Sequence, residues 1–287
     1  MTTARAIDPQ AFKSALREQW DKSAAGWNAH TPQIRAWLAT ATEAMLDLAG
    51  VRSGSRVLDV AAGSGDQTLD IARRVGTEGH VLATDLSPAI LELARENAAR
   101  AGYGNVGTKV ADGESLPVEP ASFDAAVCRL GLMFFPDPLQ GLREMHRATR
   151  PGGKACSVVF SRPDRNPCVT ILMSTALKHA GLAPRDPFQP GGLLSLGKPG
   201  LADQLFRAAG FGDVATTTLD APFRLPSARH YLDFVRSSAS PIQQILGRLD
   251  PAAADAAWAE MAQRLDEFST STGWVGPNEL LLTVGSR

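Results

Sequence analysis

The sequence of 287 residues has few cysteines, and their scarcity argues against a fold stabilised by disulfides or by zinc. Cys128, Cys156 and Cys168 form no CxxC pair and no cluster with histidine at the spacing of zinc ligands. We therefore expect neither a disulfide framework nor a metal site. Since Cys128 and Cys156 fall in apolar, strand-like runs, we expect reduced and buried thiols.

Long apolar runs are also absent. No run reaches the roughly eighteen residues that a membrane-spanning helix needs, and the N-terminal segment has no apolar core of the secretory type. Together with the few cysteines, these absences predict a cytoplasmic protein without a membrane span.

A surplus of charge of one sign is missing as well. Lys and Arg number 29 against 30 Asp and Glu, which gives a formal net charge of -1. This balance provides no general attraction to nucleic acid or to an anionic membrane. Hydrophobic residues make up 44% of the chain and charged residues 21%, an ordinary globular composition whose length suits one large domain with additions.

From about residue 50 onward, short apolar runs alternate with segments of helical periodicity. Such alternation is typical of βαβ units, whose right-handed crossovers place helices on both faces of a mostly parallel sheet. The fold class that we predict is therefore α/β, with a Rossmann-like sheet. The strands are expected at residues 56–60, 80–84, 106–111, 123–128, 154–160, 214–219 and 279–284.

Three segments depart from this alternation and are predicted to cover the sheet. Residues 1–49 are expected to form an N-terminal helical flap, with residues 50–287 as the main domain. Within the main domain, residues 161–197 and 221–272 are predicted to be lid insertions that are largely helical. Because both insertions follow strands, they can fold over the carboxyl end of the sheet, where open α/β folds bind ligands.

The strongest functional signal is the glycine-rich turn after the first strand, Asp59-Val60-Ala61-Ala62-Gly63-Ser64-Gly65. Glycine lets a ligand approach the backbone closely, and the helix that follows begins with free N–H groups. Asp85 ends the second strand, at the spacing where a carboxylate can bind two ribose hydroxyls. Asp112 ends the third strand and can accept a hydrogen bond from an adenine amino group. The three strand ends together predict a nucleoside site.

The residues beside the turn favour S-adenosylmethionine over a dinucleotide. A dinucleotide fingerprint needs a third glycine where this chain has Thr68. Asp59 places a carboxylate next to the turn, and a carboxylate suits a cationic ammonium and sulfonium better than a pyrophosphate. The alternatives that stay open for the function are an NAD(P)-dependent oxidoreductase, a non-catalytic S-adenosylmethionine-binding protein and a methyltransferase of macromolecules.

The same turn resembles motif I of the class I S-adenosylmethionine-dependent methyltransferases, with Ala61 in place of the usual first glycine. Asp85, Asp112-Gly113 and Arg129-Leu130-Gly131-Leu132 match later motifs of that family. Residues 50–160 are similar to the subgroup that includes the ubiquinone/menaquinone C-methyltransferases. The resemblance implies a seven-stranded sheet with an antiparallel last strand. It also implies methyl transfer to a small organic acceptor at carbon, nitrogen or oxygen.

The segment after the fourth strand also bears on the substrate. It lacks the Asn/Asp-Pro-Pro-Tyr type motif of methyltransferases that act on adenine or glutamine nitrogens. With the neutral charge balance, this argues against a nucleic-acid substrate. A monomer and a homodimer both stay open.

The cofactor-binding candidates come from the turn, from the strand ends and from the resemblance. In this subgroup, the N-terminal aromatic region that holds Trp20 and Trp27 often closes over the methionine end of the cofactor. The candidates are Trp27, Asp59, Ala61, Gly63, Gly65, Gln67, Asp85, Leu86, Asp112, Gly113 and Arg129.

The acceptor pocket is less well defined by the sequence, and no residue is assigned as a catalytic base. His30 and His230 lie in segments that can line the pocket, and His146 is expected to be structural. Met133 and Phe134 belong to an apolar cluster that is either core or a wall of the pocket. For Arg129, contact with an anionic acceptor and a surface ion pair are both open interpretations. The acceptor-pocket candidates are His30, Met133, Phe134 and His230.

Overall fold

The fold is described from a computed structural model, which describes residues 8–238 and 241–287. Its centre is a seven-stranded sheet in the order β3-β2-β1-β4-β5-β10-β6. All neighbours pair in parallel except β10, which runs antiparallel to both β5 and β6. The expected seven-stranded sheet with an antiparallel last strand is therefore confirmed. The strands are β1 (Arg56–Val60), β2 (His80–Asp85), β3 (Val106–Val110), β4 (Phe123–Arg129), β5 (Thr149–Phe160), β6 (Gly212–Asp220) and β10 (Glu279–Ser286).

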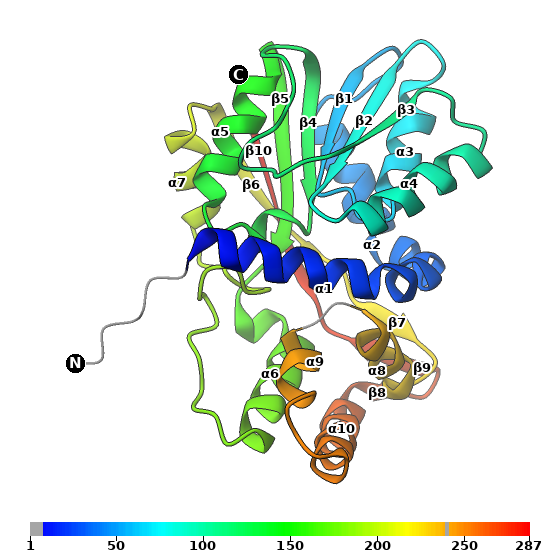
Figure 1. The fold of residues 1–287 in the computed structure, drawn as a ribbon, viewed down its shortest axis with the longest axis vertical. Helices are drawn as coiled ribbons and strands as arrows, with labels where there is room; N and C mark the ends of the chain where they lie inside the picture. Colours follow the sequence, from blue (N-terminus) through cyan, green and yellow to red (C-terminus); the bar gives the residue numbers. More distant parts are fainter. Residues whose placement is uncertain (1–7, 239–240) are drawn as a thin grey trace.

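Helices cover both faces of this sheet (Figure 1). On one face, α3 (Asp66–Val75) packs between α2 (Thr31–Leu48) and α4 (Pro88–Arg100). On the other face, α5 (Pro138–Ala148) packs against α7 (Leu201–Ala208). The central strands are buried on both sides, which explains their continuous apolar runs.

Side-chain caps begin the helices close to the positions that the sequence indicates. The hydroxyl of Ser87 accepts a hydrogen bond from the N–H of Ile90 at the start of α4. At the start of α5, the carboxylate of Asp137 accepts from the N–H of Gln140. Each cap follows the loop after a strand, so it also determines where the chain leaves the carboxyl edge of the sheet.

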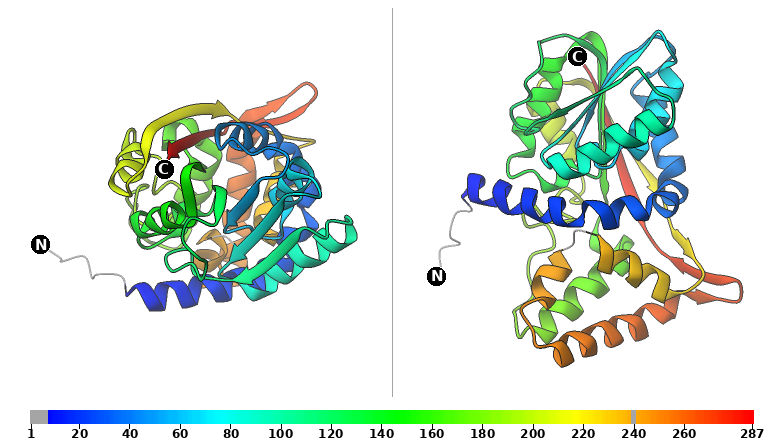
Figure 2. Two further views of the ribbon diagram at one scale, coloured as in Figure 1. Left: turned by 90° about the horizontal axis from the view of Figure 1, so that it is seen from above. Right: turned by 45° about the vertical axis from the view of Figure 1, so that its right-hand side comes forward.

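The N-terminal segment forms two helices, α1 (Pro9–Ala29) and α2, that meet at His30. Pro32 lies in the first turn of α2, where a missing N–H costs no hydrogen bond but prevents one continuous helix. α1 crosses the carboxyl edge of the sheet, between the sheet and a lower layer (Figures 1 and 2).

The lower layer is built from the two insertions and has its own hydrophobic core around Trp274. It includes a three-stranded sheet in the order β7-β9-β8, which the sequence did not predict. That sheet extends the second insertion to residue 276, four residues beyond the predicted boundary at 272. The layer consists of α6 (Pro167–His179), β7 (Phe223–Leu225), α8 (Ala228–Ser237), α9 (Pro241–Leu246), α10 (Pro251–Leu265), β8 (Ser269–Thr270) and β9 (Gly273–Gly276).

Within the described ranges, no helix has both the length and the hydropathy to cross a membrane. In the same part of the chain, no group of three or more His, Cys, Asp and Glu side chains is placed to hold a metal ion.

Candidate active site

The glycine-rich turn and Asp85 meet at the carboxyl edge of the sheet, as the sequence predicts for neighbouring parallel strands. Ala61, Gly63 and Gly65 all have positive φ, at 56°, 59° and 84°. The turn exposes the N–H of Gly63 to the carboxylate of Asp85, at 3.0 Å. The second carboxylate oxygen accepts from the N–H of Ser87 at 2.9 Å. Burial raises the pKa of Asp85, and these N–H bonds oppose the rise.

Gly65 has a packing role. A Cβ atom at this position would lie 2.9 Å from the Cβ of Ala94, so the glycine lets α3 and α4 approach closely. Ala61 stands where related motifs have glycine, and its methyl group faces Gly131, where a Cβ would lie 2.4 Å away. The glycine at 131 therefore accommodates the alanine at 61.

Asp59 lies behind the wall of the site and supports it. Its carboxylate accepts hydrogen bonds from Nε2 of Gln67 at 3.0 Å and from the hydroxyl of Thr68 at 2.6 Å. Burial raises the pKa of Asp59 to about 7, although both hydrogen bonds lower it. Thr68, which stands in place of the dinucleotide glycine, thus holds the motif carboxylate. The carboxylate of Asp59 also orients Gln67, which lines the cavity.

Arg129 ends β4 inside the protein, which excludes a surface ion pair. Its guanidinium pairs with Asp66, and both side chains are only 3% exposed. It also donates to the hydroxyl of Thr42 at 2.6 Å and to Oε1 of Gln67 at 2.7 Å. Its Nε–H has no hydrogen-bond partner among the residues that the structure describes. Both members of the ion pair line the cavity.

Asp112 is engaged by the N-terminal flap. Lys13 of α1 places its ammonium 2.6 Å from Asp112 and 2.5 Å from Glu114. Gly113 lines the cavity, and a Cβ atom there would lie 2.3 Å from the ring of Phe135. The predicted adenine turn is thus closed over by α1, with Lys13 on the cavity wall.

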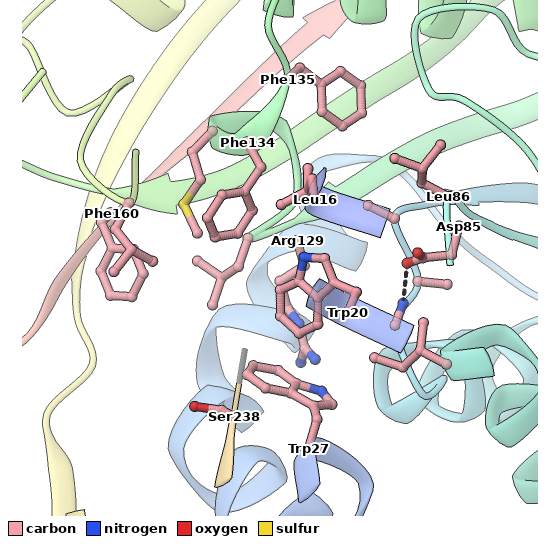
Figure 3. Close-up of a pocket in the computed structure, with 18 of the residues that line it drawn as sticks. Leu16, Trp20, Trp27, Asp85, Leu86, Arg129, Phe134, Phe135, Phe160 and Ser238 are labelled. Atoms are coloured by element: carbon pink, nitrogen blue, oxygen red, sulfur yellow. Dashed lines mark hydrogen bonds between the residues drawn. The ribbon is translucent and has the colours of Figure 1, made fainter. Parts of the chain in front are cut away.

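These groups surround one large cavity between the sheet edge, α1 and the lower layer (Figure 3). The ring centroids of Trp20 and Trp27 lie 5.4 Å apart, and Trp20 also meets Phe134 edge-on at 6.1 Å. In Figure 3, Asp85 and Leu86 lie on one side of the two indoles, and Phe160 lies on the other. The predicted residues that line this cavity are Trp27, Ala61, Gly63, Gln67, Asp85, Leu86, Gly113, Arg129, Met133 and Phe134.

The far end of the cavity, which we call the acceptor chamber, is apolar. Sequence reasoning did not identify most of its wall, because the residues come from the insertions and from β5. The helical periodicity of residues 167–179 and 228–237 was the available signal, since each helix presents one apolar face. The wall consists of Trp37, Phe160, Val169, Leu172, Met173, Leu193, Phe223, Tyr231, Phe234, Val235 and Ile242.

His30 and His230 lie close to each other but line a second cavity. Nδ1 of His30 is 2.9 Å from the carbonyl of Gly26, because His30 follows α1 and bonds back to its last turn. Nδ1 of His230 is 2.9 Å from the hydroxyl of Ser227. His146 packs edge-on against Phe211, with ring centroids 4.9 Å apart.

Comparison with known proteins adds the family. The model of the ubiE/COQ5 methyltransferase family matches residues 33–176. The ubiquinone/menaquinone biosynthesis C-methyltransferase UbiE of Idiomarina loihiensis is 40% identical over 119 residues, or 41% of this chain and 47% of that protein. Its counterpart from Hahella chejuensis is 40% identical over 126 residues, 44% of this chain and 50% of that protein. The chain therefore spans about half the length of the curated relatives that it matches.

Among solved structures, the YcgJ protein of Bacillus subtilis superposes with a TM-score of 0.58 at 19% identity, covering 87% of this chain and 98% of that one. This likeness concerns the fold. The sequence relatives and the family model do not favour the alternative of a nicotinamide-dependent oxidoreductase. The matched residues 33–176 include the glycine-rich turn, Asp85 and Arg129, and half of the chain lies within them. The chain belongs to the ubiE/COQ5 methyltransferase family.

Proposed function

We propose that the protein transfers the methyl group of S-adenosylmethionine to a small apolar acceptor, at carbon, nitrogen or oxygen. One observation carries the proposal. A single cavity joins the glycine-rich turn and Asp85 at one end to an apolar chamber at the other. A methyl transferase needs both ends in one enclosed space, because donor and acceptor must meet in line and away from water.

The polar end fits the cofactor part by part. We assign the carboxylate of Asp85 to the ribose hydroxyls and the turn of Asp112 and Gly113 to adenine; Asp85 and Gly113 line the cavity. The Nε–H of Arg129, for which the described part of the chain offers no acceptor, is suited to an oxygen of the methionine carboxylate. Asp66 and Gln67 supply oxygens for the ammonium beside it. The remaining proposed contacts are Trp27, Asp59 through Gln67, Ala61, Gly63, Gly65 through packing, and Leu86.

When bound, S-adenosylmethionine would supply a methyl group already activated by its sulfonium. The chain then has to orient the reactants and exclude water, which can lower a barrier by about 7–11 kcal/mol at best. The indoles of Trp20 and Trp27 enclose the middle of the cavity. Aromatic faces near a cationic group can stabilise it by ~0.5–2 kcal/mol.

The acceptor chamber favours an uncharged aromatic or other apolar acceptor. Within the described part of the chain, its wall carries no carboxylate, imidazole or amine. A protonated amine would be buried there without a counter-ion, at a large desolvation cost. Among the described residues of this wall, none can act as a base that deprotonates an acceptor, so the acceptor has to be nucleophilic as it arrives. Met133 and Phe134 line the same cavity.

Each segment has a proposed part in this function. We propose that residues 1–49 act as the flap over the cofactor and that the insertions at 161–197 and 221–272 build the acceptor chamber. We also propose that the protein acts on its small-molecule acceptor in the cytoplasm, as a monomer or homodimer and without nucleic acid. The balanced net charge and the three unpaired, buried cysteines support this setting.

A screen of acceptors tests the function directly. The protein is incubated with S-adenosylmethionine and separate phenols, quinols, indoles and amines, and released S-adenosylhomocysteine is measured. Turnover is expected with uncharged aromatic compounds and not with amines that are protonated at neutral pH. Turnover restricted to protonated amines would contradict the proposed acceptor class, and release with none of the compounds would contradict the function.

A further inference from the structure

The wall of the acceptor chamber is apolar except for two side chains that can donate a hydrogen bond, Trp37 and Tyr231. The indole N–H of Trp37 donates to the carbonyl of Ala221 at 2.7 Å. Ser238 also lines the cavity, and its hydroxyl donates to the carbonyl of Val235 at 3.3 Å. Trp37 and Ser238 are therefore engaged within the protein, whereas Tyr231 remains to be accounted for.

The hydroxyl of Tyr231 makes no hydrogen bond with any residue that the structure describes. Unlike Nε of Arg129, it is not one of the partnerless polar atoms that the described residues enclose completely. Because Tyr231 belongs to the chamber wall, the space beside its hydroxyl belongs to the chamber. A hydroxyl held away from bulk water without a partner costs free energy, and a ligand atom that accepts from it recovers that cost.

The side chain of Tyr231 is held by aromatic neighbours in the lower layer. Tyr231 is 4% exposed and stacks on Trp274, with centroids 5.2 Å apart and an interplanar angle of 24°. Its ring also meets Phe223 at 5.0 Å. Trp274 is itself fixed, because its indole N–H donates to the carbonyl of Leu265 at 2.7 Å. The position of the hydroxyl is thus determined before a ligand binds, which lowers the entropic cost of binding to it.

The phenol of Tyr231 is suited to donate and not to act as a base. Burial raises the pKa of Tyr231 well above its ordinary value of 10.0. At neutral pH the hydroxyl therefore stays protonated, and it can offer its proton to a lone pair of a ligand. The oxygen of a carbonyl, hydroxyl or ether group provides such a lone pair, whereas a hydrocarbon provides none.

We propose that the hydroxyl of Tyr231 donates a hydrogen bond to an oxygen atom of the acceptor, and that it thereby favours oxygen-bearing aromatic compounds over hydrocarbons of the same shape. This inference rests on the proposed methyl transfer to an apolar acceptor. It names the polar group that such an acceptor carries and the residue that binds it. A hydrocarbon leaves the hydroxyl unpaired in the closed chamber, and that unpaired group is the source of the discrimination.

The test compares two ligands of nearly the same shape, 2-methoxynaphthalene and 2-ethylnaphthalene, of which only the first has an oxygen. Each is titrated into protein saturated with S-adenosylhomocysteine, and its dissociation constant is measured from the fluorescence of the naphthalene ring. The dissociation constant of the ethyl compound is divided by that of the methoxy compound. This ratio should be about tenfold larger in the natural protein than in Tyr231→Phe, because the substitution removes only the hydroxyl.

Tyr103→Phe is the matched control, because it makes the same change at the other tyrosine of the chain, which lines neither cavity. Its ratio should equal that of the natural protein. Both variants should bind S-adenosylhomocysteine within about twofold of the natural protein. An equal ratio in the natural protein and Tyr231→Phe would overturn the inference.

Urea unfolding without ligand provides a second measurement on the same variants. Because the Tyr231 hydroxyl has no partner in the described part of the chain, Tyr231→Phe should leave the unfolding midpoint unchanged or raise it. A lower midpoint would show that the hydroxyl is bonded within the protein and would also overturn the inference. So would the absence of binding of both naphthalenes to protein that binds S-adenosylhomocysteine. Failure of the natural protein to bind S-adenosylhomocysteine would instead count against the proposed function.

Discussion

The buried pair of Arg129 and Asp66 shows how single side chains prepare the site for a ligand. Removing two charges from water is costly, and hydrogen bonds from Arg129 to Thr42 and Gln67 offset part of that cost. The Nε–H of Arg129, which has no partner among the described residues, still carries a desolvation penalty of ~1–3 kcal/mol. A ligand oxygen that accepts from this group removes the penalty, so binding at this point is stronger than one exposed hydrogen bond would allow.

Replacement of Arg129 by methionine tests this assignment. Arg129→Met should lower the affinity for S-adenosylhomocysteine by roughly 10- to 100-fold, because it removes a charge-assisted bond to the methionine carboxylate. It should leave the affinity for 5′-methylthioadenosine unchanged, since that compound lacks the amino-acid end. Both affinities are measured by calorimetry. An equal loss for the two compounds would show that Arg129 acts only on the fold of the site.

Asp59 predicts a specific dependence of stability on pH. Burial raises the pKa of Asp59 to about 7 from an ordinary value of 3.8. Between these values the folded protein binds more protons at this site than the unfolded chain, so the free energy of unfolding falls as pH rises through the window. Asp59→Asn removes that contribution. The free energy of unfolding of the natural protein minus that of the variant should therefore decrease between about pH 4 and 7, by up to ~1.4 kcal/mol per pH unit.

Urea unfolding of both proteins at stepped pH measures this difference. The other buried carboxylates are common to the two proteins, so their titrations cancel in the comparison. A difference that stays constant over the whole window would mean that Asp59 titrates normally.

For single residues, the sequence predicted the strand end at which a side chain lies better than it predicted the groups that the side chain contacts. The sequence puts Asp85 at the same sheet edge as the glycine-rich turn because the ends of adjacent parallel strands must meet, and the structure has its carboxylate 3.0 Å from the N–H of Gly63. The partner of Asp112 could not be predicted, since Lys13 is 99 residues away in the chain and lies on a helix whose docking is tertiary. The same holds for Arg129 and Thr42, which are 87 residues apart.

Among the secondary-structure elements, the contact of α1 with α8 connects the flap to the lower layer. Gly26 of α1 faces the backbone of Ser237, where a Cβ atom would lie 2.0 Å from the carbonyl oxygen. The hydroxyl of Ser237 lies 3.1 Å from Nδ1 of His30 at the end of the same helix. The close approach at Gly26 therefore determines how near the flap lies to the acceptor chamber.

Gly26→Ala should separate these two helices. Alanine in a helix interior normally stabilises it by about 1 kcal/mol relative to glycine, so a gain is expected if the contact is absent. With the contact present, the added methyl group overpacks the interface, and the free energy of unfolding should fall by ~1–3 kcal/mol. Gly104→Ala, in the turn before β3, is the control for the substitution itself, because nothing lies within 4 Å of a Cβ at that position. Urea unfolding of both variants decides the sign, and a stabilised Gly26→Ala would contradict the packing described.

Helices and long strands were predictable because their signals are local. The caps at Ser87 and Asp137 and the alternation of apolar runs lie within a few residues of the elements that they begin. The small sheet of the lower layer was not predictable from such signals. Its strand β7 has three residues and pairs with β9 about fifty residues later, so the pairing depends on the folded lower layer.

For the whole molecule, burial of the three cysteines reports on the integrity of the cores. All three are unpaired and 0% exposed, two in the sheet domain and Cys168 in the lower layer. Burial raises the pKa of each thiol to about 12, so almost no thiolate forms at neutral pH.

A disulfide reagent used near pH 8 should therefore label none of the three cysteines of the native protein within minutes. It should label all three in guanidinium chloride, as counted by mass spectrometry. Rapid labelling of Cys168 alone in the native state would mean that the lower layer opens independently of the sheet domain.

The sheet domain could be read from the sequence, whereas the complete cavity could not. Its wall combines α1, the carboxyl edge of the sheet and two insertions that lie far apart in the chain. Only packing of the insertions against the sheet edge places Phe160, Tyr231 and Phe234 in one chamber. The same packing places His30 and His230, both expected in the acceptor pocket, in the wall of the second cavity.

The central claim is that Asp85 and the glycine-rich turn bind the adenosyl part of S-adenosylmethionine. Calorimetric titration of S-adenosylhomocysteine into the natural protein and into Asp85→Ala tests it most directly. The account predicts one site per chain and a loss of roughly 10- to 100-fold in affinity for the variant, because the ribose hydroxyls lose a charged acceptor. No binding to the natural protein, or equal affinity in the two proteins, would contradict it.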